Sequence, residues 1–310
     1  METRRIGSLE VSLVGLGCNN FGGRLDAAQS TAVIHAALDA GVTLLDTADV
    51  YGGTRSEEII GDALLGRREG VVLATKFGMP LSEGGGGAKP AYLRKAVENS
   101  LRRLKTDRID LYQLHRPDPE TPVGETLAAL DDLVRAGKVR EIGCSNFSAA
   151  QLGEAAAAAR AGAAWFVSVQ NEYSLLARDA EREVLPAASA AGLAFLPYFP
   201  LASGLLSGKY RKGQPAPAGT RLGAADGRLS GRFLNDGNLA RAEALAAFAR
   251  AQGHTLLELA FSWLVARSAV SSVIAGATSS EQVRANVAAP SWKLSADELA
   301  RIDEILQPAT

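Results

Sequence analysis

Short apolar runs alternate with longer amphipathic runs eight times along this 310-residue chain. The short runs are rich in β-branched and apolar residues on both faces, a pattern typical of buried parallel strands. The longer runs place apolar residues at i, i+3 and i+4, which is typical of helices that pack on one side. Eight strand–helix units in one chain predict an α/β fold, a closed (β/α)8 TIM barrel.

The predicted strands and helices follow one another in regular order. Strands are expected at residues 13–17, 43–46, 71–76, 109–115, 139–144, 165–170, 193–198 and 272–275. Helices are expected at residues 28–40, 56–65, 90–104, 123–136, 148–160, 180–191, 256–266 and 280–287. A glycine ends five of these helices just before the next strand, as helix C-terminal caps require: Gly41, Gly70, Gly137, Gly162 and Gly192. This regularity predicts a single domain over residues 1–310.

An N-terminal hairpin and three further segments lie outside the eight units. Residues 4–11, centred on Gly7 and Ser8, predict a β-hairpin that plugs the bottom of the barrel. Two extra helices are expected, one at 239–252 and one from Ser295, which stands in capping-box register with Glu298. The polar segment 200–238 follows the seventh strand. We therefore expect a long loop on the face where barrel active sites lie.

Charge and cysteine content exclude several classes of protein. The 33 Lys and Arg residues and the 34 Asp and Glu residues are spread along the chain, so we expect neither a nucleic-acid partner nor a membrane partner. The opening residues lack the apolar core of a secretion signal, and no run reaches 18 uncharged apolar residues. Cys18 and Cys144 show no CxxC spacing. These features predict a reduced, cytoplasmic protein without structural zinc.

Polar residues at the carboxyl ends of barrel strands are the candidates for chemistry, because other strand positions fill a packed interior. Asp46 ends the second predicted strand, and Tyr51 follows in the next turn. Lys76 ends the third strand, where an unpaired ammonium would be costly, so Asp46 is its expected counter-ion. Asp46 and Lys76 could be no more than a structural ion pair in the barrel interior. A tyrosine beside Lys76 would instead have its pKa lowered and could serve as a general acid.

His115 ends the fourth predicted strand and is one of three histidines. We interpret His35, in the middle of a predicted helix, and His254, at a helix boundary, as structural. No second His or Cys shares a metal-binding spacing with His115, so polarising a substrate carbonyl beside Tyr51 is its better use. Neither GxxxxGK[ST] nor GxGxxG occurs, so any bound dinucleotide is not held by a Rossmann turn.

Seven motifs between about residues 5 and 306 resemble those of the aldo-keto reductase family. In chain order they are DTADVYGGTRSEEIIGDAL, ATKFG, DLYQLHRPD, GKVREIGCSNF, VQNEYSLL, YFPLASGLLSGKY and VIAGATSSEQVRANV. The resemblance implies a barrel that binds an extended NADP(H) and reduces a carbonyl by hydride transfer without a metal. It further implies that Tyr51 donates the proton, Lys76 lowers the Tyr51 pKa, Asp46 holds Lys76, and His115 orients the carbonyl.

The resemblance also implies the cofactor contacts. Ser145, Asn146 and Gln170 match residues that bind the nicotinamide carboxamide, although Asn146 also suits an ordinary turn. Tyr198 matches the aromatic residue that stacks on the nicotinamide, or it fills the barrel mouth. Exposed amides in a glycine-bearing turn suit a pyrophosphate. The residues of this turn are Leu201, Ser203 and Leu205, with Ser207 and Lys209 beyond them.

The adenosine end departs from much of the family. Many members place cations where this chain has Gly276 and Gln282, whereas Asn286 is kept for the adenine edge and Thr278 lies in the same motif. Lys209 and Arg221 in the long loop are substitutes for reading a 2′-phosphate. In this the chain resembles the bacterial-type branch that includes the potassium-channel β subunits.

The leading hypothesis is therefore NADP(H)-dependent reduction of small aldehydes or ketones. Phe21, Tyr51, Phe77 and the residues after His115 are expected to line the substrate pocket. The alternative is a nucleotide-sensing regulatory subunit similar to channel β subunits. A third possibility, a metal-dependent barrel hydrolase, is disfavoured because the sequence has no cluster of metal ligands. The sequence leaves the physiological substrate and the oligomeric state open.

Overall fold

Eight parallel strands form one sheet in the computed structural model, which describes residues 2–82, 84–223 and 228–307. The strand order is β10-β3-β4-β5-β6-β7-β8-β9, so each strand pairs with its neighbours in sequence and β10 returns beside β3. Every predicted strand is confirmed to within two residues at each end. The strands are β3 (Val14–Gly17), β4 (Leu44–Asp46), β5 (Val72–Phe77), β6 (Ile109–Leu114), β7 (Val139–Ser145), β8 (Phe166–Glu172), β9 (Ala194–Tyr198) and β10 (Val273–Gly276).

The sheet curls until its two edges meet. Phe195 in β9 forms a parallel bridge with Val270, just before β10. The Phe195 amide donates to the Ala269 carbonyl at 2.7 Å, and the Phe195 carbonyl accepts from the Ser271 amide at 3.1 Å. These bonds make a nearly closed barrel, as the eightfold alternation predicts.

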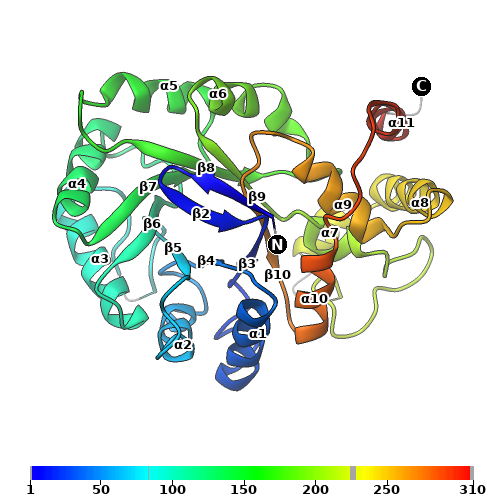
Figure 1. Cartoon of the computed structure of the whole chain (residues 1–310), viewed down its shortest axis with the longest axis horizontal. Helices are drawn as coiled ribbons and strands as arrows, with labels where there is room; N and C mark the ends of the chain where they lie inside the picture. Colours follow the sequence, from blue (N-terminus) through cyan, green and yellow to red (C-terminus); the bar gives the residue numbers. More distant parts are fainter. Residues whose placement is uncertain (1, 83, 224–227, 308–310) are drawn as a thin grey trace.

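A ring of helices surrounds the barrel (Figure 1). Seven of the eight predicted helices are confirmed with small shifts at their ends, and Ser148 and Thr255 cap two of them with capping boxes. The ring contains α1 (Ala27–Asp39), α2 (Arg55–Ala63), α3 (Pro90–Leu104), α4 (Val123–Arg135), α5 (Ala149–Ala158), α6 (Val184–Ala190), α9 (Leu256–Val265) and α10 (Ser280–Ala288).

The prediction of a continuous helix at 180–191 is wrong for its first turn, because the α-helix begins only at Val184. A 3-10 turn, η1 (Asp179–Glu181), precedes α6, and Glu183 between them is not helical. Glu181 is fixed there by the hydroxyl of Tyr173, which donates to its carboxylate at 2.6 Å, and by Arg178 at 2.7 Å. These tertiary contacts override the local helical periodicity.

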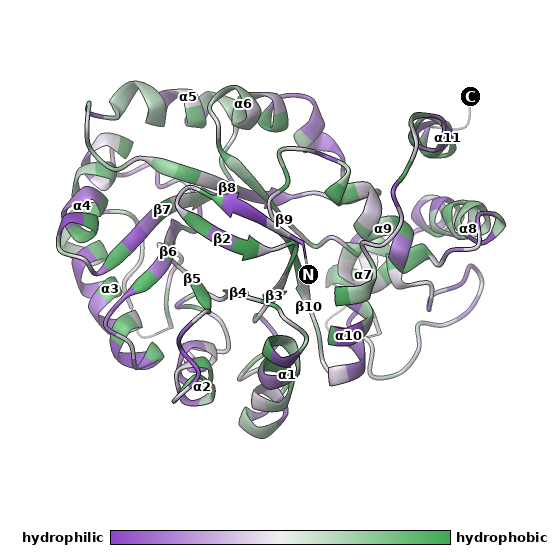
Figure 2. Ribbon diagram, in the orientation of Figure 1, coloured by the Kyte–Doolittle hydropathy of each residue, from purple (hydrophilic) through white to green (hydrophobic). Residues whose placement is uncertain are grey.

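The N-terminal hairpin is confirmed as β1 (Thr3–Ile6) and β2 (Leu9–Ser12). It lies across one end of the barrel (Figure 1), and β2 is the more hydrophobic of its two strands (Figure 2). Ile6, Leu9 and Val11 join one buried cluster with inward-facing strand residues such as Leu44 and Leu196. The hairpin therefore plugs the barrel bottom, and the opposite end is left for chemistry.

The two extra helices are also confirmed. α8 (Asp236–Ala251) begins three residues before the predicted 239 because Asn235 caps it, accepting from the Asn238 amide at 2.9 Å. α11 (Ala296–Leu306) begins after Ser295, whose predicted capping box with Glu298 is present. Both lie outside the helical ring (Figure 1). None of the helices in the described residues is long and apolar enough to cross a bilayer.

The segment predicted as a loop at 200–238 contains two short helices, η2 (Ala202–Ser207) and α7 (Arg228–Phe233). Residues 224–227 of this segment lie outside the described residues. Tyr210, Leu222 and Phe233 are buried and anchor the segment against the barrel. Its path folds back toward the barrel mouth, where Arg24 donates to the Gly219 carbonyl at 3.1 Å.

Candidate active site

A cavity of about 960 Å³ opens at the carboxyl ends of the barrel strands. It is large enough for a dinucleotide and a small substrate together. Most of the predicted site residues line it. They are Asp46, Tyr51, His115, Ser145, Asn146, Gln170, Tyr198, Leu201, Ser203, Ser207, Lys209, Arg221, Gly276, Thr278, Gln282 and Asn286.

The expected ion pair lies in the interior of the barrel mouth. The Lys76 Nζ atom is 2.7 Å from Oδ2 of Asp46 and donates to the Thr47 carbonyl at 2.8 Å, and the Lys76 side chain is fully buried. Burial lowers the pKa of Lys76, but the Asp46 carboxylate and Tyr51 raise it, and the net direction is upward. Lys76 therefore stays protonated beneath the cavity.

The second oxygen of Asp46 is held from two other strands. Gln170 in β8 donates to Oδ1 at 2.9 Å, and Gln113 in β6 donates to it at 3.3 Å. Sequence reasoning missed Gln113. A signal was present, because Gln113 pairs with Lys76 across adjacent parallel strands and must face the same side of the sheet.

Tyr51 lies beside Lys76, whose Nζ atom is 5.2 Å from the Tyr51 ring centroid. The expectation that its pKa falls toward neutrality is wrong for this structure. Burial raises the pKa of Tyr51, and the nearby positive charge of Lys76 lowers it only in part. Tyr51 is consequently a protonated phenol at neutral pH, with an ammonium placed to stabilise the phenolate once the proton leaves.

His115 meets the Tyr51 ring edge-on, with centroids 5.8 Å apart and planes at 80°. Burial, followed by the charges of Lys76 and Arg116, lowers the pKa of His115 to about 3. The imidazole is therefore neutral and can donate or accept a hydrogen bond. Its backbone is fixed by Asn146, whose Nδ2 donates to the His115 carbonyl at 2.9 Å.

The other two histidines make contacts of their own outside this cavity. Nε2 of His35 lies 3.0 Å from the Ala63 carbonyl. His254 stacks on Trp292 with ring centroids 4.2 Å apart. In the described part of the chain, no group of three or more His, Cys, Asp or Glu residues could hold a metal ion.

A hydrogen-bond network crosses the centre of the cavity. The Tyr198 hydroxyl donates to Oδ1 of Asn146 at 2.8 Å, and Nδ2 of Asn146 also reaches the Ser145 hydroxyl at 3.0 Å. Ser145 in turn donates to the Gln170 carbonyl at 2.8 Å. These bonds fix the orientation of the predicted nicotinamide residues, and the Gln170 side chain points to Asp46.

The turn after β9 has an unusual backbone. Ala202, Ser203 and Gly204 are successively left-handed, and the Ala202 and Gly204 amides donate within the turn, to the Phe199 carbonyl at 2.9 Å and the Leu201 carbonyl at 2.8 Å. The Ser203 hydroxyl is buried and has no partner among the described residues. Leu205, predicted in the same role, is buried in the core and does not line the cavity.

The part of the cavity that the long segment lines carries a cluster of cations. Burial and the charge of Arg24 lower the pKa of both Lys209 and Arg221. Arg221 donates to the side-chain oxygens of Asn19 and Asn20 at 3.1 and 3.3 Å. Sequence reasoning missed Arg24, which is brought to this cluster only by the folding back of the long segment.

Nearby, the Gln282 side chain is already engaged. Its Oε1 accepts from the Thr278 amide at 2.9 Å and lies 3.2 Å from the Thr278 hydroxyl. Gly276 lines the cavity without a side chain. The cationic groups at this end therefore come from the long segment and from Arg24.

The expectation that Phe21 and Phe77 line the substrate pocket is wrong. Phe21 and Phe77 are fully buried in the core, and Phe77 stacks on Tyr112 at 4.8 Å. Side chains alternate along a strand, so Phe77 faces outward when Lys76 faces the barrel interior. Met79 lines the cavity instead, as does Arg116, which directly follows His115.

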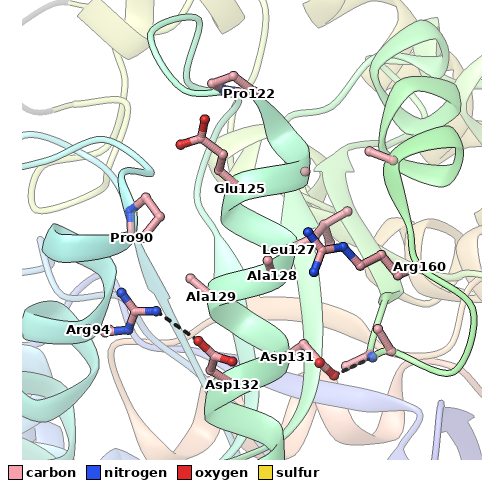
Figure 3. A pocket seen from close by; sticks show the side chains of 14 residues that line it. Pro90, Arg94, Pro122, Glu125, Leu127, Ala128, Ala129, Asp131, Asp132 and Arg160 are labelled. Carbon is pink, nitrogen blue, oxygen red and sulfur yellow. Dashed lines mark hydrogen bonds and ion pairs between the residues drawn. The ribbon is translucent and has the colours of Figure 1, made fainter.

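A second cavity, of about 640 Å³, lies on the outer face between α3, α4 and the end of α5 (Figure 3). Of its five charged lining residues, Arg94, Asp131 and Asp132 are paired with one another or with backbone. Arg94 binds Asp132 at 2.9 Å, and Asp131 accepts from the Ala164 amide at 2.8 Å. The cavity at the barrel mouth is therefore the candidate active site.

The fold and this site define a (β/α)8 barrel with a phenol, a neutral imidazole and a buried ammonium at the carboxyl ends of its strands. The aldo/keto reductase family model matches residues 13–307, and the chain belongs to that family of oxidoreductases.

Related proteins and solved structures are consistent with this family assignment. The chain is 37% identical over 299 residues to a probable voltage-gated potassium channel subunit beta from Oryza sativa subsp. japonica, covering 93% of this chain and 91% of that protein. It is 35% identical over 308 residues to the aldo-keto reductase YhdN from Bacillus subtilis (strain 168), covering 96% and 91%.

Two solved structures match nearly the whole chain. The holo form of aldo-keto reductase AKR11C1 from Bacillus halodurans has a TM-score of 0.81 and 32% identity, covering 100% of this chain and 97% of that one. Glycerol dehydrogenase AKR11B4 from Gluconobacter oxydans has a TM-score of 0.85 and 31% identity, covering 99% and 97%.

Proposed function

We propose that this protein reduces aldehyde or ketone carbonyls to alcohols with NADPH, and that Tyr51 donates the proton. The observation that carries the proposal is the grouping of Tyr51, Lys76 and His115 at the barrel mouth, beside a cavity of about 960 Å³ that is large enough for a dinucleotide. A phenol that is protonated at neutral pH and lies beside a fixed ammonium is suited to general-acid work.

The residues present fit a nicotinamide dinucleotide. Lys209 and Arg221 face the cavity without a carboxylate partner among the described residues, and the buried Ser203 hydroxyl is unpaired. We propose that these groups hold the phosphates and that Asn146 and Tyr198 hold the nicotinamide end. The cofactor, when bound, supplies the hydride that reduces the carbonyl carbon.

The chain's own residues would manage the proton. The carbonyl oxygen would lie between the Tyr51 hydroxyl and the neutral His115 ring, both of which can donate to it. As negative charge develops on that oxygen, Tyr51 releases its proton, and Lys76 stabilises the resulting phenolate. Asp46, held by Gln113 and Gln170, keeps the ammonium in position.

We further propose that residues 1–310 act as one domain in the cytoplasm on a small carbonyl substrate. The two cysteines support a reducing compartment, because Cys18 and Cys144 are both free and buried.

The test is loss of NADPH absorbance with a panel of aldehydes, α-dicarbonyls, quinones and sugars, repeated with NADH. We expect turnover with at least one class and a preference for NADPH. Tight NADPH binding without turnover on any class would contradict the proposal and favour a nucleotide-sensing subunit.

A further inference from the structure

Among the described residues that line the cavity at the barrel mouth, positive charge exceeds what the one lining carboxylate can balance. That carboxylate, Asp46, is already bound to Lys76. Within the part of the chain that the structure describes, the lining cations are Arg24, Arg116, Lys209 and Arg221. An excess of fixed cations in a partly enclosed site favours anionic ligands.

The four cations fall into two places. Arg24, Lys209 and Arg221 form one group, because Arg24 acts electrostatically on both of the others and contacts the same segment through Gly219. Arg116 stands apart from this group in the chain, directly after His115, and its charge acts on His115 and Tyr198. The proposed cofactor accounts for the first group only.

Arg116 is uncompensated. It is exposed to the cavity and makes no hydrogen bond or ion pair with any described residue. The nearby carboxylates are otherwise engaged. Asp118 accepts from the Ala88 amide at 2.7 Å and the Thr121 hydroxyl at 2.8 Å, and Glu172 forms a two-bond pair with Arg232 at 2.6 and 2.7 Å.

The backbone that carries Arg116 is well fixed. Asn146 holds the preceding carbonyl, that of His115, at 2.9 Å. Pro117 follows, and a proline restricts the residue before it to extended conformations. The base of the Arg116 side chain is therefore anchored next to the proposed carbonyl site, and only its long stem is free to adapt.

We infer that the substrate is a carbonyl compound that carries a carboxylate, and that Arg116 binds this group. A planar guanidinium binds a carboxylate through two parallel hydrogen bonds, and one positive charge balances one negative charge. The inference rests on the proposed reductase function and deepens it by naming the substrate class. Arg116 selects substrates in this role and takes no part in proton transfer.

The experiment compares matched substrates. The kcat/KM values are measured for benzaldehyde, for 2-, 3- and 4-carboxybenzaldehyde, and for the corresponding carboxamides, which keep the shape without the charge. We expect at least one acid to exceed its carboxamide by about ten-fold or more, as a charge-assisted hydrogen bond implies. This selectivity ratio should fall as salt concentration rises.

Variants then assign the effect to Arg116. Arg116→Ala should lower the ratio at least ten-fold, and Arg116→Lys should keep part of it because the charge remains. Arg182→Ala is the matched control, since Arg182 is 83% exposed outside the cavity, and its ratio should equal that of the wild type.

The possible outcomes distinguish a failure of this inference from a failure of the proposed reductase function. Good turnover of benzaldehyde with ratios near one at all three ring positions would overturn the anionic-substrate inference alone. A high ratio that survives Arg116→Ala would also overturn it. No turnover of any aldehyde, α-dicarbonyl, quinone or sugar would overturn the proposed function, and this inference with it.

Discussion

Gln170 donates a hydrogen bond from its Nε2 to Oδ1 of Asp46 at 2.9 Å, across the barrel from the strand that carries Asp46. Both side chains are buried. The other oxygen of Asp46 binds Lys76, so Gln170 is linked to Tyr51 through a carboxylate and an ammonium. A glutamine expected only at the nicotinamide thus also anchors the Asp46–Lys76 pair beside Tyr51.

Removing this bond should cost stability before any cofactor is added. Gln170→Leu leaves a buried carboxylate oxygen with only the longer bond from Gln113, and a hydrogen bond to a charged group contributes about 1.5–3 kcal/mol. Urea unfolding of the cofactor-free protein should show a loss of that size. Ser168→Ala on the same strand is the control, because the Ser168 hydroxyl is buried without a partner among the described residues. A loss no larger than that of Ser168→Ala would show that Gln170 does not hold Asp46.

Lys76→Met tests the ion pair. It leaves Asp46 as a buried carboxylate without its cation, which typically costs about 3–5 kcal/mol. Adding Asp46→Asn to this variant should restore part of the stability, because the unpaired charge is removed. Activity should fall in both variants. If the pH–rate profile of Lys76→Met matched that of the wild type, Lys76 would not tune Tyr51.

Asp49 should make the protein less stable as pH rises. It is 1% exposed, and both of its carboxylate oxygens are unpaired among the described residues. Burial, and then the charge of Glu57, raises the pKa of Asp49 from 3.8 to about 7. Between these values the folded state holds a proton that the unfolded state has lost, so the free energy of unfolding falls by about 1.4 kcal/mol per pH unit.

Asp49→Asn should remove this slope. The variant should be more stable than the wild type above pH 7 and similar to it below pH 4, as measured by urea unfolding across pH. Asp118→Asn should behave in the opposite sense. Burial raises the pKa of Asp118, but bonds from Ala88, Glu120 and Thr121 lower it overall, so this variant should lose stability near pH 7 and match the wild type at low pH. A parallel pH dependence for wild type and Asp49→Asn would refute the assignment.

Arg221→Ala tests the coenzyme preference. If Arg221 binds the 2′-phosphate, the ratio of kcat/KM for NADPH to that for NADH should fall about ten-fold or more. Lys212→Ala is the matched control on the same segment, because Lys212 does not line the cavity and its Nζ pairs loosely with Asp236 at 3.8 Å. Equal losses for both coenzymes would mean that Arg221 supports the segment without recognising the phosphate.

Much of the fold could be predicted because barrel strands have a distinct pattern. Both faces of β5 and β6 are buried, so their sequences are mostly apolar, although Asp110 also interrupts β6 for a structural ion pair with Arg68. Lys76 and His115 stand out against that background. The orientation of Phe77 was also predictable, because it must face away from Lys76, its neighbour in the strand.

Other features depend on tertiary structure and could not be predicted. The direction of the Tyr51 pKa is set by how far the surrounding segments exclude water, which outweighs the charge of Lys76. Arg24 joins Lys209 and Arg221 only through the path of a segment nearly 200 residues further along the chain. The local pattern of apolar residues predicts neither the burial of Tyr51 nor the position of Arg24.

The most direct test of the account is the single-turnover rate of Tyr51→Phe with NADPH and a good aldehyde. Phenylalanine keeps the ring that meets His115 edge-on and removes only the proton donor. The rate should fall about 10²–10⁴-fold, while NADPH affinity, measured by fluorescence titration, stays near the wild-type value. A near-normal rate would contradict the assignment of Tyr51 as the acid and the mechanism built on it.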